Sequence, residues 1–357
     1  MELTSVIAAF SFGSAVTGVK ECTFGHINGT YFVDTAEDRY VLQRINKNVF
    51  KKPWEIMENV VGVTDHIRKK LAASGGDVKN GALQFVPAGD RYYHVDEAGE
   101  YWRAYRFVAG DCYQFCDSSD LFRRVGRAFG HFQNQLADYD AATLFEVIPD
   151  FHNTVKRFEA FEAAVAADVC GRARDCAAEI AFIRERRDVC GFIVGGLADG
   201  RFPLRVTHND TKLNNVIMDP ATGEGLCVID LDTVMPGSLL YDFGDAIRYG
   251  ASSAAEDETD LDKVFVKPDL FAAFTEGYVS GTEGAMTRDE TLALPESARV
   301  LTLETGIRFL TDHLSGDTYF RIHHAGHNLE RARNQLKLVA SIEEQRPALD
   351  AIVKKYL

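Results

Sequence analysis

One stretch, residues 204–232, constrains the fold of this chain more than any other. It begins with alternating apolar and polar residues, which predicts a short strand that leads into a polar loop. Two further apolar runs, 216–218 and 226–229, flank the turn-forming sequence Asp-Pro-Ala-Thr-Gly. These runs predict a β-hairpin, and a hairpin folds back on itself. We therefore expect Asn215 at its start and Asp230 at its end to lie close together.

The polar loop carries chemically active side chains at a characteristic spacing. Asp210 stands two residues after His208 and five residues before Asn215, which is the spacing H-x-D-x-x-x-x-N of the catalytic loop of kinases. In such a loop the aspartate accepts the proton of the attacking hydroxyl, and amide and carboxylate oxygens bind Mg²⁺. We therefore predict Asp210 as a catalytic base and Asn215 and Asp230 as metal ligands. Lys212 would place positive charge on the migrating phosphoryl group.

Other interpretations of this region are possible. A polar loop and hairpin in an ordinary α/β protein is the alternative, but four side chains at these spacings favour phosphoryl transfer. Asp242-Phe243-Gly244 matches the D-F-G motif of protein kinases, yet it lies too far beyond the hairpin, and Asp230 takes that position. We expect Asp242 and Asp245 to be structural, either capping a helix at residues 246–249 or bonding the catalytic loop.

The sequences THNDTKLNNVIMD and VIDLDTVMPGSLLYDFGD resemble the aminoglycoside phosphotransferase and choline kinase-like superfamily. Within it the resemblance is closest to the bacterial N-acetylhexosamine 1-kinases, and it extends over GHINGTYFV, FGHFQNQL, LETGIRFLTDHLSGDTYF and HNLERARNQLKLV. This resemblance implies a kinase that uses ATP and Mg²⁺ to phosphorylate the anomeric 1-hydroxyl of N-acetylglucosamine or N-acetylgalactosamine. It also implies that Asp210 contacts the sugar, with Asp232 and Arg308 as further candidates.

The expected fold is α+β, a protein-kinase-like fold with two lobes. Residues 1–108 would form a small nucleotide-binding lobe with an antiparallel sheet, and residues 109–357 a larger, mainly helical lobe with the catalytic loop and the substrate pocket. The periodicity of apolar residues predicts strands at 16–24, 30–33, 39–45, 83–86, 92–95 and 101–108, and helices at 1–12, 54–71, 121–136, 261–278, 298–314 and 328–344, with two further helical stretches within 163–187.

A turn with two glycines lies between the first two predicted strands. In kinases such a turn covers the nucleotide phosphates and offers them backbone N–H groups. A plain hairpin is the alternative, and the catalytic loop later in the chain favours the phosphate lid. The segment that begins at Phe107 would be the hinge, whose backbone binds adenine. The predicted nucleotide-binding residues are therefore Gly25, His26, Asn28 and Gly29 in the turn, and Phe107 and Val108 at the hinge.

The phosphate-binding lysine of kinases is missing from its usual strand. Gln43 occupies the expected position, with Arg44 next to it. Neighbours on a strand face opposite sides, so these two side chains cannot both point at a nucleotide, and the cation of this lobe is left unassigned. Glu55 or Glu58 on the following helix could orient a cation, but without the lysine we expect both to face solvent.

Composition limits the partners of the chain. The formal net charge of −14 argues against nucleic acid, because a phosphate backbone requires clustered Lys and Arg. The N-terminus lacks a basic start and no apolar run approaches a membrane span, so we expect neither a signal peptide nor a membrane. Seven scattered cysteines fit a reduced, cytoplasmic protein. ATP and a small-molecule sugar are the expected partners, and the oligomeric state stays open.

Several alternatives remain open from the sequence alone. Arg308 and Asp312 share a helix face and form either an exposed ion pair or a sugar-contacting pair. The histidines at 323–327 lack an acidic companion at metal-site spacing, and Gly326 favours a turn there. The function could also be that of another small-molecule kinase of the superfamily, acting on a different sugar, an aminoglycoside, choline or homoserine. A catalytically inactive nucleotide-binding regulator is the remaining alternative, favoured by the missing strand lysine.

Overall fold

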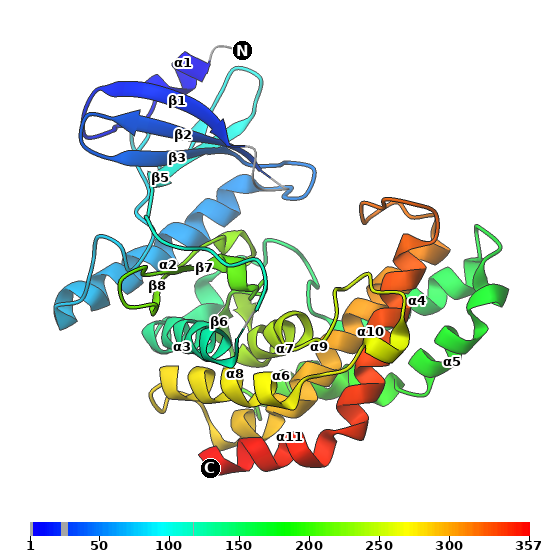
Figure 1. Ribbon diagram of the computed structural model, residues 1–357. Coiled ribbons are helices and arrows are strands. Elements are labelled where there is room, and N and C mark those ends of the chain that lie inside the picture. The colour runs from blue at the N-terminus through cyan, green and yellow to red at the C-terminus, as the bar shows by residue number, and fades with distance from the viewer. Residues whose placement is uncertain (1–2, 23–27, 117) are drawn as a thin grey trace.

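The N-terminal part of the chain forms an antiparallel sheet with the strand order β1-β2-β3-β5-β4 (Figure 1). The computed structural model describes residues 3–22, 28–116 and 118–357. Within them the sheet strands are β1 (Val16–Cys22), β2 (Gly29–Thr35), β3 (Arg39–Arg44), β4 (His94–Val95) and β5 (Tyr101–Arg106). Five of the expected strands are therefore confirmed, although the one expected at 92–95 pairs only over its last two residues and residues 23–24 lie outside the described part of the chain.

The strand expected at residues 83–86 is wrong. This segment makes an isolated bridge, between Phe85 and Tyr105, with two backbone hydrogen bonds, from Val86 N–H to Ala104 O and from Arg106 N–H to Gln84 O. Pro87 follows directly. Because proline has no N–H to donate, the ladder of hydrogen bonds cannot extend through this position.

The two faces of the sheet have different partners, since side chains alternate along each strand. One face packs against α1 (Leu3–Ala8) through Val6, Val33 and Trp102. The helix expected at 1–12 is therefore confirmed over residues 3–8, whereas residues 9–12 are not helical. The other face carries two rows of cross-strand neighbours, which are Phe32, Val41 and Tyr105 in one row and Thr30, Gln43 and Arg103 in the next. This second face meets the C-terminal helical region.

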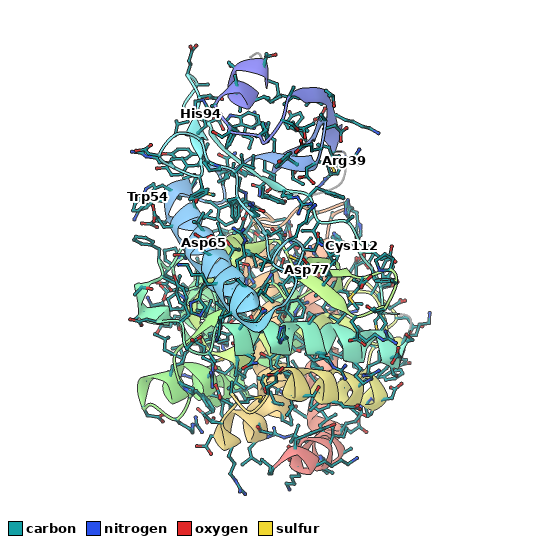
Figure 2. All side chains as sticks on the ribbon, turned by 90° about the vertical axis from the view of Figure 1, so that its left-hand side faces the viewer. Arg39, Trp54, Asp65, Asp77, His94 and Cys112 are labelled. Atoms are coloured by element: carbon teal, nitrogen blue, oxygen red, sulfur yellow. The ribbon has the colours of Figure 1, made fainter. Side chains whose placement is uncertain are left out.

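Helix α2 (Pro53–Ser74) lies between the sheet and the C-terminal helices (Figure 1). It begins at a proline, which suits the first helical turn, and ends at Gly75, whose φ of 73° is left-handed. Figure 2 shows α2, with Trp54 and Asp65 labelled on it, between the sheet above and α3 below. Its apolar face packs with Phe132 and Val234 of the C-terminal region. Helix and sheet therefore share a core with the rest of the chain.

That shared core crosses the predicted boundary between the lobes. The hydrophobic cluster around α2 contains Ile45 and Val63 from one side of residue 108, and Ile217 and Leu231 from the other side. The division into residues 1–108 and 109–357 stays a prediction.

The C-terminal region is mainly helical and contains two short antiparallel strand pairs, β6 with β9 and β7 with β8. Its helices and strands are α3 (Ser119–Gln135), α4 (Thr154–Ala167), α5 (Ala177–Arg184), α6 (Phe192–Ala198), β6 (Arg205–Thr207), β7 (Val216–Met218), β8 (Gly225–Val228), β9 (Met235–Gly237), α7 (Leu239–Gly250), α8 (Pro268–Gly281), α9 (Arg288–Leu314), α10 (His327–Glu344) and α11 (Arg346–Val353). Among the described helices, none is long and apolar enough to cross a membrane.

Two helix starts differ from the prediction. Helix α8 begins at Pro268 rather than at residue 261, because a proline suits the first turn, where its missing N–H would have no partner in the helix. Helix α9 begins at Arg288 rather than at 298. A capping box of Thr287 and Glu290 starts it, and the helix then continues through Pro295. The turn expected at Gly326 is confirmed by its φ of 87°.

Helices α3 and α8 pack closely because glycines face the partner backbone. A Cβ atom on Gly277 would lie 1.8 Å from the carbonyl oxygen of Arg123, and one on Gly130 would lie 2.2 Å from the carbonyl oxygen of Tyr278. Real atoms cannot approach so closely, so any side chain at these positions would push the two helices apart.

We predict that Gly277→Ala lowers the free energy of unfolding by about 1–3 kcal/mol, the usual cost of overpacking a core. Gly195→Ala in α6 is the matched control, because a Cβ there meets nothing within 4 Å. The control should raise stability by roughly 0.5–1 kcal/mol, since alanine favours a helix over glycine. Urea unfolding of both variants measures the difference, and equal stabilities would contradict the close helix contact.

Candidate active site

The loop between β6 and β7 is built around a buried histidine. His208 Nδ1 accepts the backbone N–H of Asp210 at 3.2 Å, and His208 Nε2 donates to the carbonyl oxygen of Ile229 at 2.8 Å. The ring packs edge-on against Phe129 and Phe132. Since Nδ1 accepts a hydrogen bond, the ring proton resides on Nε2. His208 thus connects the backbone of Asp210 to the end of the hairpin.

A second buried group, the carboxylate of Asp242, fixes the loop through hydrogen bonds to its backbone. It accepts the backbone N–H groups of His208 at 3.0 Å and Asn209 at 2.7 Å, and the side-chain amide of Gln133 at 2.8 Å. Asp245 accepts the N–H of Thr211 at 3.2 Å. Burial raises the pKa of Asp242, although His208 and these donors oppose the rise.

Two structural roles were expected for Asp242 and Asp245, and one of them, hydrogen bonding to the catalytic loop, is confirmed. Both residues bond the catalytic loop. The other role, capping a helix at residues 246–249, is wrong, because α7 begins at Leu239 and Ser238 caps it.

Two residues beside the site have left-handed backbones, Asn209 with φ 65° and Asp230 with φ 58°. Asn and Asp tolerate this conformation better than other residues with a side chain. Asn209 Nδ2 donates to the carbonyl oxygens of Thr207 at 3.3 Å and Thr233 at 2.8 Å, which secures the strained turn. Such strain concentrates at functional sites.

The residues predicted for catalysis gather around Asp210. Lys212 Nζ lies 2.6 Å from Asp210 Oδ1. Asn215 Nδ2 donates to Asp210 O at 2.7 Å and to Asp210 Oδ2 at 3.1 Å. The N–H of Ile229 donates to Asn215 O at 2.9 Å, so the hairpin of β7 and β8 brings Asn215 beside Asp230, as the sequence predicts.

Negative charge accumulates at Asp230. Burial, together with the nearby carboxylates of Asp232 and Asp210, raises the pKa of Asp230 to about 6. Burial alone would lower the pKa of Lys212, but the carboxylates of Asp210 and Asp245 outweigh it and raise the pKa, so Lys212 stays charged. The crowded carboxylates favour a cation at this point.

The donor set fits Mg²⁺ that also binds phosphate. Among the described residues, no group of three or more His, Cys, Asp or Glu could hold a metal by itself. Asn215 uses Nδ2 toward Asp210, which leaves its Oδ1 for a cation next to Asp230. Mg²⁺ commonly takes one or two protein oxygens and fills its octahedron with water and phosphate oxygens.

Asp232 is held by the N-terminal sheet. Its Oδ1 accepts Arg103 Nη1, and its Oδ2 accepts Asn28 Nδ2 at 2.8 Å. Arg103 also donates from Nε at 3.0 Å and from Nη2 at 2.8 Å to Gln43 Oε1. Both oxygens of the buried Asp232 are therefore engaged, and its predicted contact with sugar stays a prediction. Arg103 could not be identified from the sequence, since only the strand register places it opposite Gln43.

The two glutamates of α2 behave differently. Glu58 is exposed, as expected. Glu55 is buried and lies 2.8 Å from Lys52, so the expectation that it faces solvent is wrong. Helix α2 directs the Glu55 side chain toward the protein, and the ammonium group of Lys52 pairs with its carboxylate.

The predicted nucleotide contacts are only partly described. Gly25 and His26 lie outside the described residues. Asn28 Oδ1 accepts the N–H of Asn46 at 3.0 Å, and Gly29 begins β2. Phe107 N–H donates to Arg39 O at 2.9 Å within the sheet, and Val108 is buried. Nucleotide binding by these residues stays a prediction.

Arg308 lies among aromatic rings rather than beside Asp312. Its guanidinium is 5.4 Å from the ring centroids of Phe151 and Phe320 and 6.0 Å from that of Tyr319. The buried Asp312 accepts three backbone N–H groups of residues 318–320 and the side chain of Asn328. The exposed ion pair is therefore wrong. Arg308 and Tyr319 line a cavity of about 220 Å³.

His152 was not identified from the sequence because no motif surrounds it. Its Nδ1 donates to Glu304 Oε1 at 2.8 Å, and Glu304 Oε2 accepts Thr154 Oγ1 at 2.6 Å. Burial would raise the pKa of Glu304, but His152, Arg308 and Thr154 lower it, so the carboxylate is ionised. His152 Nε2 is buried without a hydrogen-bond partner among the described residues. It lines a cavity of about 180 Å³ with Asn209 and Tyr241.

We predict that Asp242→Ala exposes the amides of residues 208–211 to hydrogen exchange and lowers stability by roughly 1–3 kcal/mol for each buried donor left without an acceptor. Replacing the exposed Asp262 by Ala is the control and should change neither quantity. Hydrogen exchange with mass spectrometry measures the loop, and urea unfolding measures stability. Unchanged protection of the loop in Asp242→Ala would show that the carboxylate does not hold it.

Comparison with known proteins agrees with this geometry. A family model described as the phosphotransferase enzyme family (APH) matches residues 18–270. The choline kinase of Cryptosporidium parvum Iowa II is 13% identical with a TM-score of 0.58, over 92% of this chain and 89% of that chain. An aminoglycoside phosphotransferase of Alicyclobacillus acidocaldarius is 12% identical with a TM-score of 0.57, over 99% and 95%.

A spectinomycin phosphotransferase, solved with ADP and spectinomycin, is also similar. It is 14% identical with a TM-score of 0.54, over 97% of this chain and 98% of that chain. These similarities confirm the predicted protein-kinase-like fold, with an N-terminal antiparallel sheet and a helical C-terminal region.

Proposed function

This chain belongs to the phosphotransferase enzyme family, and from that premise we propose that it is an ATP- and Mg²⁺-dependent N-acetylhexosamine 1-kinase of the cytoplasm. Family and fold establish a small-molecule kinase, and the sugar is our proposal. In this proposal residues 1–108 form the nucleotide lobe, and residues 109–357 supply catalysis and the acceptor pocket. The observation that carries it is the grouping of Asp210, Lys212 and Asn215 beside Asp230.

The catalytic loop supplies a positioned base and a cation. Asp210 would accept the proton of the sugar's 1-hydroxyl as that oxygen attacks the γ-phosphate in line. The hydrogen bond from Asn215 Nδ2 holds the Asp210 carboxylate in place. Lys212 would stabilise the charge that spreads over the phosphoryl oxygens. Mg²⁺, held by Asn215 Oδ1 and Asp230, would neutralise the phosphates of ATP. The relative solved with ADP supports the nucleotide.

The acceptor side suits a neutral, hydroxyl-rich ring. Tyr319 is 69% exposed and stands beside Arg308, where its ring can stack on the apolar face of a sugar. Arg157, Arg308 and Asp312 line the same cavity. Because the Asp312 carboxylate already accepts three backbone N–H groups and a side-chain amide, the two guanidinium groups oppose a cationic acceptor such as choline or an aminoglycoside. His152 Nε2 can bond a hydroxyl group whether or not it is protonated, because a hydroxyl both donates and accepts.

We predict turnover with N-acetylglucosamine and N-acetylgalactosamine, measured as ADP release from ATP and Mg²⁺. Glucose, galactose, choline, homoserine and kanamycin complete the acceptor panel. Asp210→Asn should lower kcat by at least about a hundredfold, as expected for loss of a general base, and should still bind ATP.

The outcomes separate the alternatives. Turnover confined to the acetylated sugars and lost in Asp210→Asn would support both mechanism and substrate. Turnover on another acceptor would refute the sugar and retain the kinase. Nucleotide binding without turnover on any acceptor would favour the inactive regulator.

We also predict that His152→Phe, which keeps a ring between Phe151 and Tyr241, raises the KM for the sugar roughly tenfold, the equivalent of one hydrogen bond. The KM for ATP should not change, because His152 faces the acceptor side. His324→Phe, at an exposed histidine of the loop before α10, is the matched control. An unchanged sugar KM in His152→Phe would exclude His152 from the acceptor pocket.

A further inference from the structure

The sheet lacks a lysine where kinases place their phosphate-binding cation, and position 43 holds a glutamine instead. In the register of β3 and β5, Gln43 stands directly opposite Arg103. Side chains of directly paired residues lie on the same face of a sheet. An arginine therefore occupies the same face as the missing lysine, one strand away.

Gln43 fixes the position of this arginine. Its Oε1 accepts both Nε and Nη2 of Arg103 at 3.0 and 2.8 Å, and its own Nε2 donates to Thr30 Oγ1 at 3.3 Å. The bond to Thr30 turns the carbonyl oxygen of the amide toward the guanidinium. Gln43 carries no charge, so its role here is to orient the cation of the neighbouring strand.

Arg103 reaches from the sheet to the segment that follows the catalytic hairpin. Its Nη1 pairs with Asp232 Oδ1, and both side chains are almost entirely buried, with the Arg103 residue 4% exposed. Asp232 comes two residues after Asp230, in a single 3₁₀ turn. Asn28 Nδ2 donates to the second oxygen of this carboxylate, Asp232 Oδ2. One polar residue of the sheet, Arg103, and one directly before β2, Asn28, therefore fix the turn that begins at Asp230.

We propose that Arg103 takes the place of the absent strand lysine as a positioning residue, which acts through Asp232 to hold Asp230 where it binds the metal of the nucleotide. This inference rests on the role of Asp230 in the proposed function. Arg103 does not contact phosphate in this scheme, because the residue is buried and each of its three nitrogen atoms already donates to Gln43 or Asp232. Its charge opposes the repulsion between Asp232 and Asp230 in the same turn.

The first test is ADP binding, with and without metal, in Arg103→Met. We expect ADP affinity in Mg²⁺ to fall roughly ten- to a hundredfold, the usual effect of losing the partner of a metal-binding group. ADP affinity in EDTA should change less than twofold. Arg44→Met is the matched control, because this arginine of the same sheet is exposed, and it should behave as the wild type.

The second test restores a cation at the usual kinase position. Gln43→Lys combined with Arg103→Met should recover part of the lost Mg²⁺-dependent affinity, because a lysine at position 43 can reach Asp232. Gln43→Met combined with Arg103→Met should recover none. Asp232→Asn should produce the same loss as Arg103→Met, and the double variant should be no worse than either, because the two residues act as one pair.

The outcomes are distinct from those of the acceptor panel, since ADP binding needs no sugar. Equal loss of ADP affinity in Mg²⁺ and in EDTA would overturn the inference and place Arg103 on the phosphates. Wild-type affinity in Arg103→Met would also overturn it. If Arg103→Met does not fold, Arg103→Lys replaces it. Arg103→Lys should fold and bind Mg²⁺–ADP better than Asp232→Asn, and the reverse order would refute the proposal.

Discussion

The catalytic loop depends on one buried carboxylate, that of Asp242. It accepts two consecutive backbone amides of the loop and one side-chain amide from α3. The carboxylate therefore provides the hydrogen-bond acceptors that a neighbouring strand would provide in a regular sheet. The position of α7, which carries Asp242, is set in turn by α9. A Cβ on Gly244 would lie 2.5 Å from the carbonyl oxygen of Ser297, which shows how closely these helices approach. Helix packing thereby determines where Asp210 stands.

Electrostatics around the loop follow from this arrangement. Asp210, Asp230 and Asp232 are gathered by backbone geometry, and burial, together with the repulsion from the other two carboxylates, raises the pKa of Asp230 to about 6. The strongly acidic chain offers only local compensation, from Lys212 on one side and Arg103 on the other. Each of these cations is tied to one carboxylate, so the charge at Asp230 itself is left for a metal to balance.

Local patterns in the sequence were sufficient for the hairpin and the catalytic loop, because turn residues and short spacings determine both. They were insufficient wherever a contact joins distant segments. The role of Arg103 can be recognised only from the register of β3 and β5, and that of His152 only from its bond to Glu304 on α9. The start of α9 was predicted at residue 298 instead of 288, although the capping box of Thr287 and Glu290 can be recognised in the sequence. The strand expected at 83–86 did not form because Pro87 ends its pairing with β5 after a single bridge.

The attachments of the N-terminal sheet have a mechanical consequence. Its first attachment is the core around α2, and the second is the segment after β5, which two backbone bonds between Asp111 and Met218 fix to β7. A rigid body held at two points can still rotate about the line that joins them. The bonds of Arg103 and Asn28 to Asp232 add a third point, and three points that do not lie on one line remove that rotation. Because this third point includes the ion pair of Arg103 with Asp232, a change of charge at the catalytic turn would weaken the attachment of the sheet to the helices.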